Sequence, residues 1–195
     1  MTGSAKRSER NTTIEGHMQR EDNEQWGARL AAGDAGAWAE GEAAYRGDRV
    51  RFALGYLGDV AAAEDAAQET FVRALSSGSA PEAVRPWLYR IARNLCLNTL
   101  RSRRVRSEER LPTRAPFHES VVGHLTRLVA REDVHGLREE LERLSLEHRE
   151  VLGLRYGEDL SRAEIAEVLD LAPSVVKSRL YEATKVLRDR AGRQA

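Results

Sequence analysis

Residues 160–190 carry the pattern that most constrains how this chain folds. Apolar side chains recur there at spacings of three and four in two short runs, Ile165, Val168 and Leu169, then Val176, Leu180, Ala183 and Leu187. Ser161 and Glu164 are spaced as a capping box at the start of the first run, and Pro173 suits the first turn of the second. The pattern predicts two short amphipathic helices joined by a tight turn.

The second of these helices carries hydroxyl, aromatic and cationic side chains away from its apolar face. They are Ser174, Lys177, Ser178, Arg179, Tyr181 and Lys185. Such groups suit phosphates and base edges in a DNA major groove. The segment therefore predicts a DNA-binding helix-turn-helix, with a plain helical hairpin bearing a solvated charged face as the alternative.

The overall charge of the chain does not indicate a nucleic-acid partner. The chain has 31 basic and 31 acidic residues, so its formal net charge is zero and any electrostatic footprint must be local. One local concentration lies between residues 85 and 114, which hold nine arginines and two acidic residues. Such a run is either a DNA-facing patch or a solvated segment.

Cysteine and histidine usage argues against redox and metal chemistry. The single Cys96 excludes an internal disulfide, and the five histidines show no ligand spacing with it. We therefore expect a small buried apolar role for Cys96, no metal and no cofactor. Because the sequence has no long apolar run and no secretory signal, we expect a soluble cytoplasmic protein without membrane insertion.

Periodicity divides the chain into segments. Residues 1–23 are polar and predict a disordered N-terminal tail, whereas residues 24–106 follow a helical period and predict a first domain. Residues 107–129 hold two prolines and Gly123, which is typical of a linker, and residues 130–192 predict a second helical domain. Since no strand pattern competes, the expected fold is all-α, with two small helical domains joined by a flexible linker.

The helical period of the first domain begins at Trp26 and Leu30, which lie one turn apart, and longer helices follow. Asp34 is placed to cap a helix whose larger side chains are aromatic, Trp38, Tyr45, Phe52 and Tyr56. Gly41 and Gly55 interrupt it at about 1 kcal/mol each relative to alanine, and the sequence does not explain them. A second helix is expected from about residue 60 to 75, with Ala67, Phe71 and Leu75 inward. The third follows Pro86 and turns Leu88, Ile91, Ala92 and Leu95 inward.

Two sets of motifs resemble conserved regions of a known family. Residues 63–74 (AEDAAQETFVRA) and 87–94 (WLYRIARN) resemble region 2 of the extracytoplasmic-function sigma factors of the sigma-70 family. Residues 149–152, 163–166 and 176–180 resemble region 4 of the same proteins. Both sets occur in the family's order.

The resemblance implies a bacterial transcription initiation factor that is not itself an enzyme. It implies binding to core RNA polymerase at the β′ clamp and the β flap, and recognition of the −10 and −35 elements of promoter DNA. It also implies control by an anti-sigma factor, which the predicted linker would allow to rearrange the two domains.

The resemblance also assigns roles to individual residues. The docking surface for polymerase consists of Asp65, Gln68, Glu69 and Arg73, which share one helix face. The −10 element is assigned to the loop 76–86 and to Trp87, Tyr89, Arg90, Arg93, Asn94, Asn98 and Arg101. For Trp87 a place in the core is an equal alternative. The −35 element is assigned to the six residues of the second helix of the helix-turn-helix, with Arg179 expected to contact guanine or a phosphate.

Three positions depart from the family pattern. Glu182 stands where a basic residue is frequent, so promoter preference is expected to differ. Ala172 replaces a hydroxyl cap before the recognition helix, at a cost of about 1 kcal/mol. Asn98 replaces a frequent aspartate.

Two functions from other classes remain as alternatives. One is a DNA-binding regulator whose helix-turn-helix acts alone, with the first domain as a sensing or dimerisation module. The other is a helical hydrolase using Glu64, Asp65 and Glu69, although neither a metal-ligating histidine nor a nucleophile–base pair accompanies these carboxylates.

Overall fold

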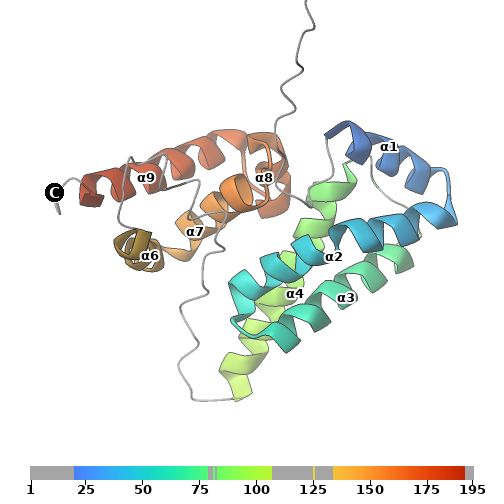
Figure 1. Ribbon diagram of the computed structural model, residues 1–195, viewed down its shortest axis with the longest axis horizontal. Helices are drawn as coiled ribbons and strands as arrows, with labels where there is room; N and C mark the ends of the chain where they lie inside the picture. The colour runs from blue at the N-terminus through green and yellow to red at the C-terminus, as the bar shows by residue number, and fades with distance from the viewer. Residues whose placement is uncertain (1–19, 79–80, 82, 107–124, 126–133, 192–195) are drawn as a thin grey trace, which may run out of the picture.

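The computed structural model describes residues 20–78, 81, 83–106, 125 and 134–191. An N-terminal bundle is formed by α1 (Arg20–Ala31), α2 (Ala35–Leu57), α3 (Val60–Ser76) and α4 (Val84–Arg106). A C-terminal bundle is formed by α6 (Val134–Glu142), α7 (Leu146–Leu152), a π-helical turn (Gly153–Gly157), α8 (Arg162–Leu169) and α9 (Pro173–Ala191). Throughout the described residues the regular structure is helical, which confirms the all-α prediction (Figure 1).

Local signals set both ends of α2. The Asp34 side chain accepts hydrogen bonds from the backbone N–H groups of Gly36 and Ala37, which caps α2. Gly58 ends α2 in the left-handed conformation, with φ 66°. Helix α1 begins at Arg20, so its first turn lies inside the segment 1–23 that was expected to be a tail; residues 1–19 lie outside the described residues.

Packing of α1 on α2 explains Gly41. Trp26 of α1 is 2% exposed, and its indole N–H donates to the carbonyl of Ala37 at 2.6 Å. A Cβ atom at position 41 would overlap the Trp26 indole, so only glycine lets the two helices approach this closely. At Gly55 an added Cβ would meet nothing within 4 Å, and the structure offers no packing reason for that glycine.

Helix α3 buries a face of small side chains against α2 and α4. Ala63, Ala67 and Ala74 are at most 2% exposed. Leu75 is 53% exposed, so the prediction that it points inward was wrong. Each step of four residues turns a side chain about 40° further round the helix, and the spacing from Ala67 through Phe71 to Leu75 therefore leaves the buried face.

The helix-turn-helix forms as predicted. Both hydrogen bonds of the capping box are present between Ser161 and Glu164, and Pro173 is the first residue of α9. The turn between α8 and α9 includes Asp170 in the left-handed region, with φ 55°. Ser145 caps α7, and the helical segment continues through the π-helical turn to Gly157.

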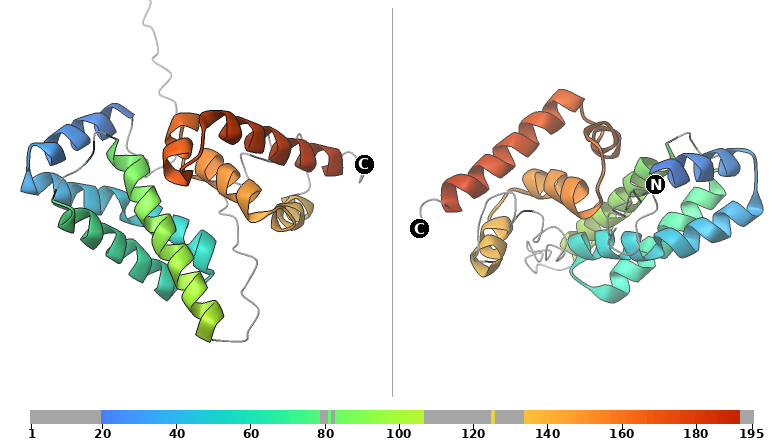
Figure 2. Two further views of the ribbon diagram at one scale, coloured as in Figure 1. Left: turned by 180° about the vertical axis from the view of Figure 1, so that it is seen from behind. Right: turned by 45° about the horizontal axis from the view of Figure 1, so that its top comes forward.

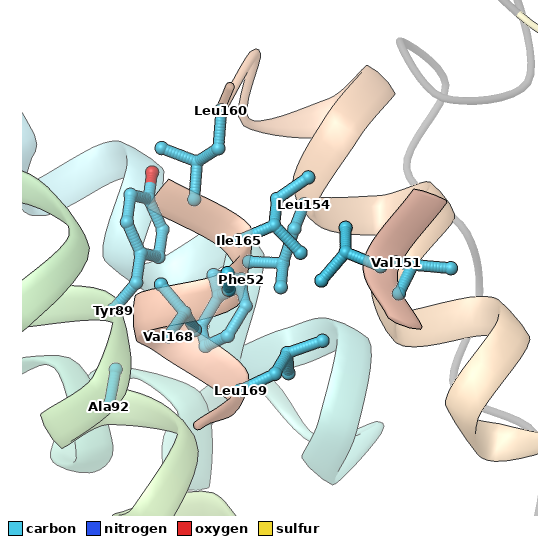
Figure 3. Packing of buried hydrophobic residues seen from close by; sticks show 11 residues of the cluster. Phe52, Tyr89, Ala92, Val151, Leu154, Leu160, Ile165, Val168 and Leu169 are labelled. Atoms are coloured by element: carbon cyan, nitrogen blue, oxygen red, sulfur yellow. The ribbon is translucent and has the colours of Figure 1, made fainter. Parts of the chain in front are cut away.

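The two bundles share a hydrophobic core, which the sequence did not predict. Phe52, Tyr89 and Ala92 of the N-terminal bundle pack in one cluster with residues of the C-terminal bundle (Figure 3), namely Val151, Leu154, Leu160, Ile165, Ala166, Val168, Leu169 and Val176. Helix α8 lies directly against α4 (Figure 2). The bundles therefore form one body in this structure, which we call the closed arrangement.

Most of the predicted linker, residues 107–124 and 126–129, lies outside the described residues. Leu125 of that segment is fully buried in a cluster with Leu137 and Leu141. Cys96 is a buried free cysteine, as expected, and burial raises the pKa of its thiol to about 12. Among the described helices, none combines the length and apolarity needed to cross a membrane.

Candidate nucleic-acid and protein interfaces

Five side chains form an exposed strip along α9, which we call the α9 stripe. They are Ser174, Lys177, Ser178, Tyr181 and Lys185, all of them exposed. Tyr181 is 65% exposed, which is unusual for an aromatic ring. The opposite side of α9 is fixed in the core by Val176, Ala183 and Leu187. The core contact thus turns cationic, hydroxyl and aromatic groups outward together.

Arg179 does not share this surface. Its guanidinium Nη2 lies 3.2 Å from Oε2 of Glu147 on α7, and its side chain is only 23% exposed. Position 179 lies about 100° round the helix from Ser178, toward α7. The structure thus brings the other predicted −35 residues together but not Arg179.

Glu182 lies at the margin of the α9 stripe. Its Oε1 accepts a hydrogen bond from the Ser178 hydroxyl at 3.0 Å, and its Oε2 lies 3.6 Å from Nε2 of His148 on α7. The sequence marked Glu182 only as a departure from a family pattern. The contact with α7 was not visible because it joins residues that are far apart in the chain.

A second strip runs along α4, the α4 stripe. It consists of Trp87, Arg90, Asn94, Asn98 and Arg101, whose spacing of three and four places them on one helix face. Arg90, Asn94, Asn98 and Arg101 are exposed, and Arg101 donates to the Asn98 side-chain oxygen at 3.2 Å. Arginine side chains bind phosphates, and asparagine side chains bind base edges.

Trp87 belongs partly to the core, and its contact with the −10 element stays a prediction. It is half-buried and packs against the cluster that contains Trp26 and Leu88. It also lines a cavity of about 260 Å³ between the bundles, together with Pro81, Ala83, Pro86, Arg90, Glu167 and Asp170. Of the loop 76–86, residues 79, 80 and 82 lie outside the described residues.

The other two predicted −10 residues, Tyr89 and Arg93, face the C-terminal bundle instead of solvent. The Tyr89 hydroxyl donates to Oε2 of Glu158 at 2.5 Å, and Tyr89 is 3% exposed. Arg93 makes a bidentate contact with Glu150 at 2.7 and 3.1 Å, and the Tyr56 hydroxyl donates to the same carboxylate at 2.6 Å. In the closed arrangement the prediction that Tyr89 and Arg93 contact DNA therefore does not hold.

Burial changes the ionisation of these contact groups. Desolvation raises the pKa of Glu158 to about 7, although the hydrogen bond from Tyr89 favours its charged form. Burial and the neighbouring Glu158 carboxylate raise the pKa of Tyr89 well above its ordinary value. Arg85 donates to the Glu158 backbone carbonyl and lies 5.9 Å from the centre of the Tyr89 ring. A carboxyl group that titrates near neutral pH thus lies where the bundles meet.

The predicted docking residues on α3 are exposed together. Asp65, Gln68, Glu69 and Arg73 all face solvent, and Arg73 contacts Glu69 at 2.7 Å. Val72 and Leu75, exposed by 49% and 53%, lie beside them and were not predicted as part of this surface. We call these six residues the α3 surface. Large apolar side chains next to charged ones are typical of a protein-binding face.

Comparisons with known proteins agree with both bundles. Residues 43–106 match the family model for sigma-70 region 2, and residues 135–187 match that for sigma-70 region 4. Over 148 residues the chain is 36% identical to the ECF RNA polymerase sigma factor SigL of Mycobacterium tuberculosis, covering 71% of this chain and 79% of SigL. The chain belongs to the extracytoplasmic-function RNA polymerase sigma factors. It is also 29% identical over 167 residues to SigW of Bacillus subtilis, covering 80% of this chain and 89% of SigW.

Two solved structures share the fold of this sigma factor. One is CnrH in complex with the cytosolic domain of CnrY, with a TM-score of 0.61, 22% identity and coverage of 89% of this chain and 99% of CnrH. The other is RpoE of Bartonella quintana in complex with the anti-sigma factor NepR, with a TM-score of 0.57, 20% identity and coverage of 77% and 94%. As a sigma factor the chain is a transcription initiation factor, with the α4 stripe in region 2 and the α9 stripe in region 4.

Proposed function

We propose that this sigma factor holds core RNA polymerase through the α3 surface and reads promoter DNA at two separate places. The α9 stripe contacts the −35 element, and the α4 stripe contacts the −10 element. The observation that carries this proposal is the presence of two exposed polar stripes on helices in regions 2 and 4. The working units are residues 24–106 and 130–192, acting in the cytoplasm without catalysing a reaction.

At the −35 element, some side chains of the α9 stripe contact phosphates and others contact bases. Lys177 and Lys185 neutralise phosphates, which position the helix without reading sequence. Ser178 and Tyr181 face the base edges, where a hydroxyl hydrogen-bonds and an aromatic ring contacts thymine methyl groups. Arg179, paired with Glu147, instead holds α9 against α7.

At the −10 element, the α4 stripe fits single-stranded as well as double-stranded DNA. Arg90 and Arg101 neutralise phosphates, and the side-chain amides of Asn94 and Asn98 read base edges. The half-buried indole of Trp87 borders the inter-bundle cavity and offers a face on which an unpaired base can stack.

The α3 surface fits a protein partner. Val72 and Leu75 supply exposed apolar area, and Asp65, Glu69 and Arg73 supply charges beside it. Charges at a rim steer association and orientation more than they add affinity. The proposed partner on this surface is the β′ clamp of the polymerase, with the β flap binding elsewhere on region 4.

Promoter binding requires the closed arrangement to open. Arg93 and Tyr89 are hydrogen-bonded to Glu150 and Glu158 of the C-terminal bundle. The side chains of Arg93 and Tyr89 therefore reach DNA only after α4 separates from that bundle. CnrH and the Bartonella RpoE were solved in complex with CnrY and with an anti-sigma factor, respectively. By analogy, an anti-sigma factor that favours the closed arrangement would keep this chain from polymerase and promoter.

The test is transcription by core bacterial RNA polymerase with the full chain on a promoter library. A Lys177→Ala/Tyr181→Ala variant is expected to lose −35 dependence and still bind core polymerase. A Val72→Ala/Glu69→Ala variant is expected to lose polymerase binding. Gln25→Ala, an exposed position on α1, serves as the control and should change neither.

Two results would contradict the proposal. One is equal loss of promoter recognition and polymerase binding in both double variants. The other is tight binding of a promoter duplex by the chain alone, without any transcription when polymerase is added. The second result would favour a regulator whose helix-turn-helix acts alone.

A further inference from the structure

Glu182 is an acid at the margin of a stripe that otherwise suits an anionic ligand. Its side chain is 57% exposed and lies one helical turn beyond Ser178, next to Tyr181. The Ser178 hydroxyl at 3.0 Å and His148 Nε2 at 3.6 Å hold the carboxylate from two sides. The group is therefore oriented within the stripe and still open to a ligand.

The chemistry of a carboxylate limits what that ligand can be. An ionised carboxylate only accepts hydrogen bonds, so it repels phosphates and the acceptor atoms of bases. In the major groove the donors are the amino groups of cytosine N4 and adenine N6. Adenine N6 lies between two acceptors, its own N7 and thymine O4. Cytosine N4 has an acceptor, guanine O6, on one side only. A carboxylate therefore favours cytosine.

We propose that Glu182 is a specificity-determining residue that accepts a hydrogen bond from N4 of a cytosine in the −35 element. Ser178 and His148 are the positioning residues for that contact. The inference rests on the proposed function, in which the α9 stripe lies in the major groove of this element. A good bidentate base contact changes affinity by about 5- to 150-fold between the right and the wrong base, and this single hydrogen bond belongs at the lower end of that range.

The experiment selects −35 sequences with holoenzyme. Core polymerase and the full chain transcribe from a library that is randomised across the −35 element, and the base frequencies among active promoters are read at each position. The native chain should favour cytosine about tenfold over each of the other bases at one position. Glu182→Ala should lose that preference and leave the other positions unchanged. Glu182→Gln should shift it toward adenine, because a glutamine amide pairs with adenine N6 and N7.

A matched control separates base reading from anchoring of the helix. Glu147→Gln removes the charge from the contact between Glu147 and Arg179, which also joins α7 to α9. If Glu182 acted only by anchoring α9, this variant would change the selected sequences in the same way.

The inference is overturned if Glu182→Ala and the native chain select the same −35 sequences. It is also overturned if Glu147→Gln reproduces the effect of Glu182→Ala. If the native holoenzyme selects no −35 sequence at all, the proposed function fails with it. Selection that survives unchanged in Glu182→Ala removes only the role of Glu182.

Discussion

Replacing Glu150 with alanine should open the closed arrangement. The Glu150 side chain is 4% exposed and accepts two hydrogen bonds from Arg93 and one from Tyr56, both in the other bundle. Removing it leaves a guanidinium and a hydroxyl between the bundles without their carboxylate. Both groups regain water once α4 moves away from α7 and α8, so the cost falls mainly on the closed arrangement.

The magnitude follows from burial. Breaking a buried ion pair from one side costs about 3–5 kcal/mol. Arg93 keeps 21% of its side chain exposed, so partial hydration places the cost near the lower end of that range. A change of about 3 kcal/mol shifts the ratio of closed to open chains roughly 100-fold.

Energy transfer between two dyes measures this ratio. Ser76 at the end of α3 and Arg188 on α9 are exposed, and cysteines placed there report the separation of the bundles. Cys96 does not compete for the dyes, because it is buried and its pKa is raised to about 12. Glu147→Ala is the matched control, since it removes another α7 carboxylate, whose contact with Arg179 lies within its own bundle. Equal energy transfer in Glu150→Ala, Glu147→Ala and the native chain would refute a closing role for Glu150.

Three further predictions concern pH, packing and docking. The closed arrangement raises the pKa of Glu158 from 4.5 to about 7, so the closed chain binds a proton more tightly than the open chain. The ratio of closed to open chains should therefore fall by up to about tenfold per pH unit between pH 5 and 7. In dye measurements the Glu158→Gln variant should lose this pH dependence. In urea unfolding, Gly41→Ala should destabilise by about 1–3 kcal/mol through overlap with a buried indole, whereas Gly55→Ala on the same helix should stabilise by up to about 1 kcal/mol; equal effects would contradict the packing argument. Val72→Ser/Leu75→Ser should reduce capture of core polymerase at least tenfold at unchanged stability, because both side chains are already exposed, and unaltered capture would exclude them from the docking surface.

The helix-turn-helix could be predicted because its signals are local. The capping box of Ser161 and Glu164 and the proline at position 173 each act within one helical turn, and the structure has all of them. Leu75 shows where the same reasoning fails. A spacing of four approximates the helical period only over one or two turns, so the side chain drifts off the buried face.

In the candidate sites, too, the features set by local helix geometry could be predicted, and the features set by distant residues could not. Stripe membership depends on helix geometry, and the α9 stripe and most of the α4 stripe are exposed as expected. The positions of Tyr89, Arg93 and Arg179 depend on carboxylates 32 to 69 residues away in the chain, which periodicity does not reveal. Gly41 belongs to this second class too, since its reason is a tryptophan on a neighbouring helix.

The contacts between the bundles resemble the contacts that the same side chains would make with DNA. Glu150 binds Arg93 through two oxygens, as a phosphate group would. The buried Glu158 carboxylate accepts a hydrogen bond from the Tyr89 hydroxyl. Under the proposed function, region 4 and promoter DNA would therefore compete for the face of α4 that carries Tyr89 and Arg93. Polymerase binding would decide that competition if it held regions 2 and 4 at separate places, because the carboxylates of region 4 would then leave α4. The affinity of the isolated chain for a promoter should then be low even where every reading residue is intact.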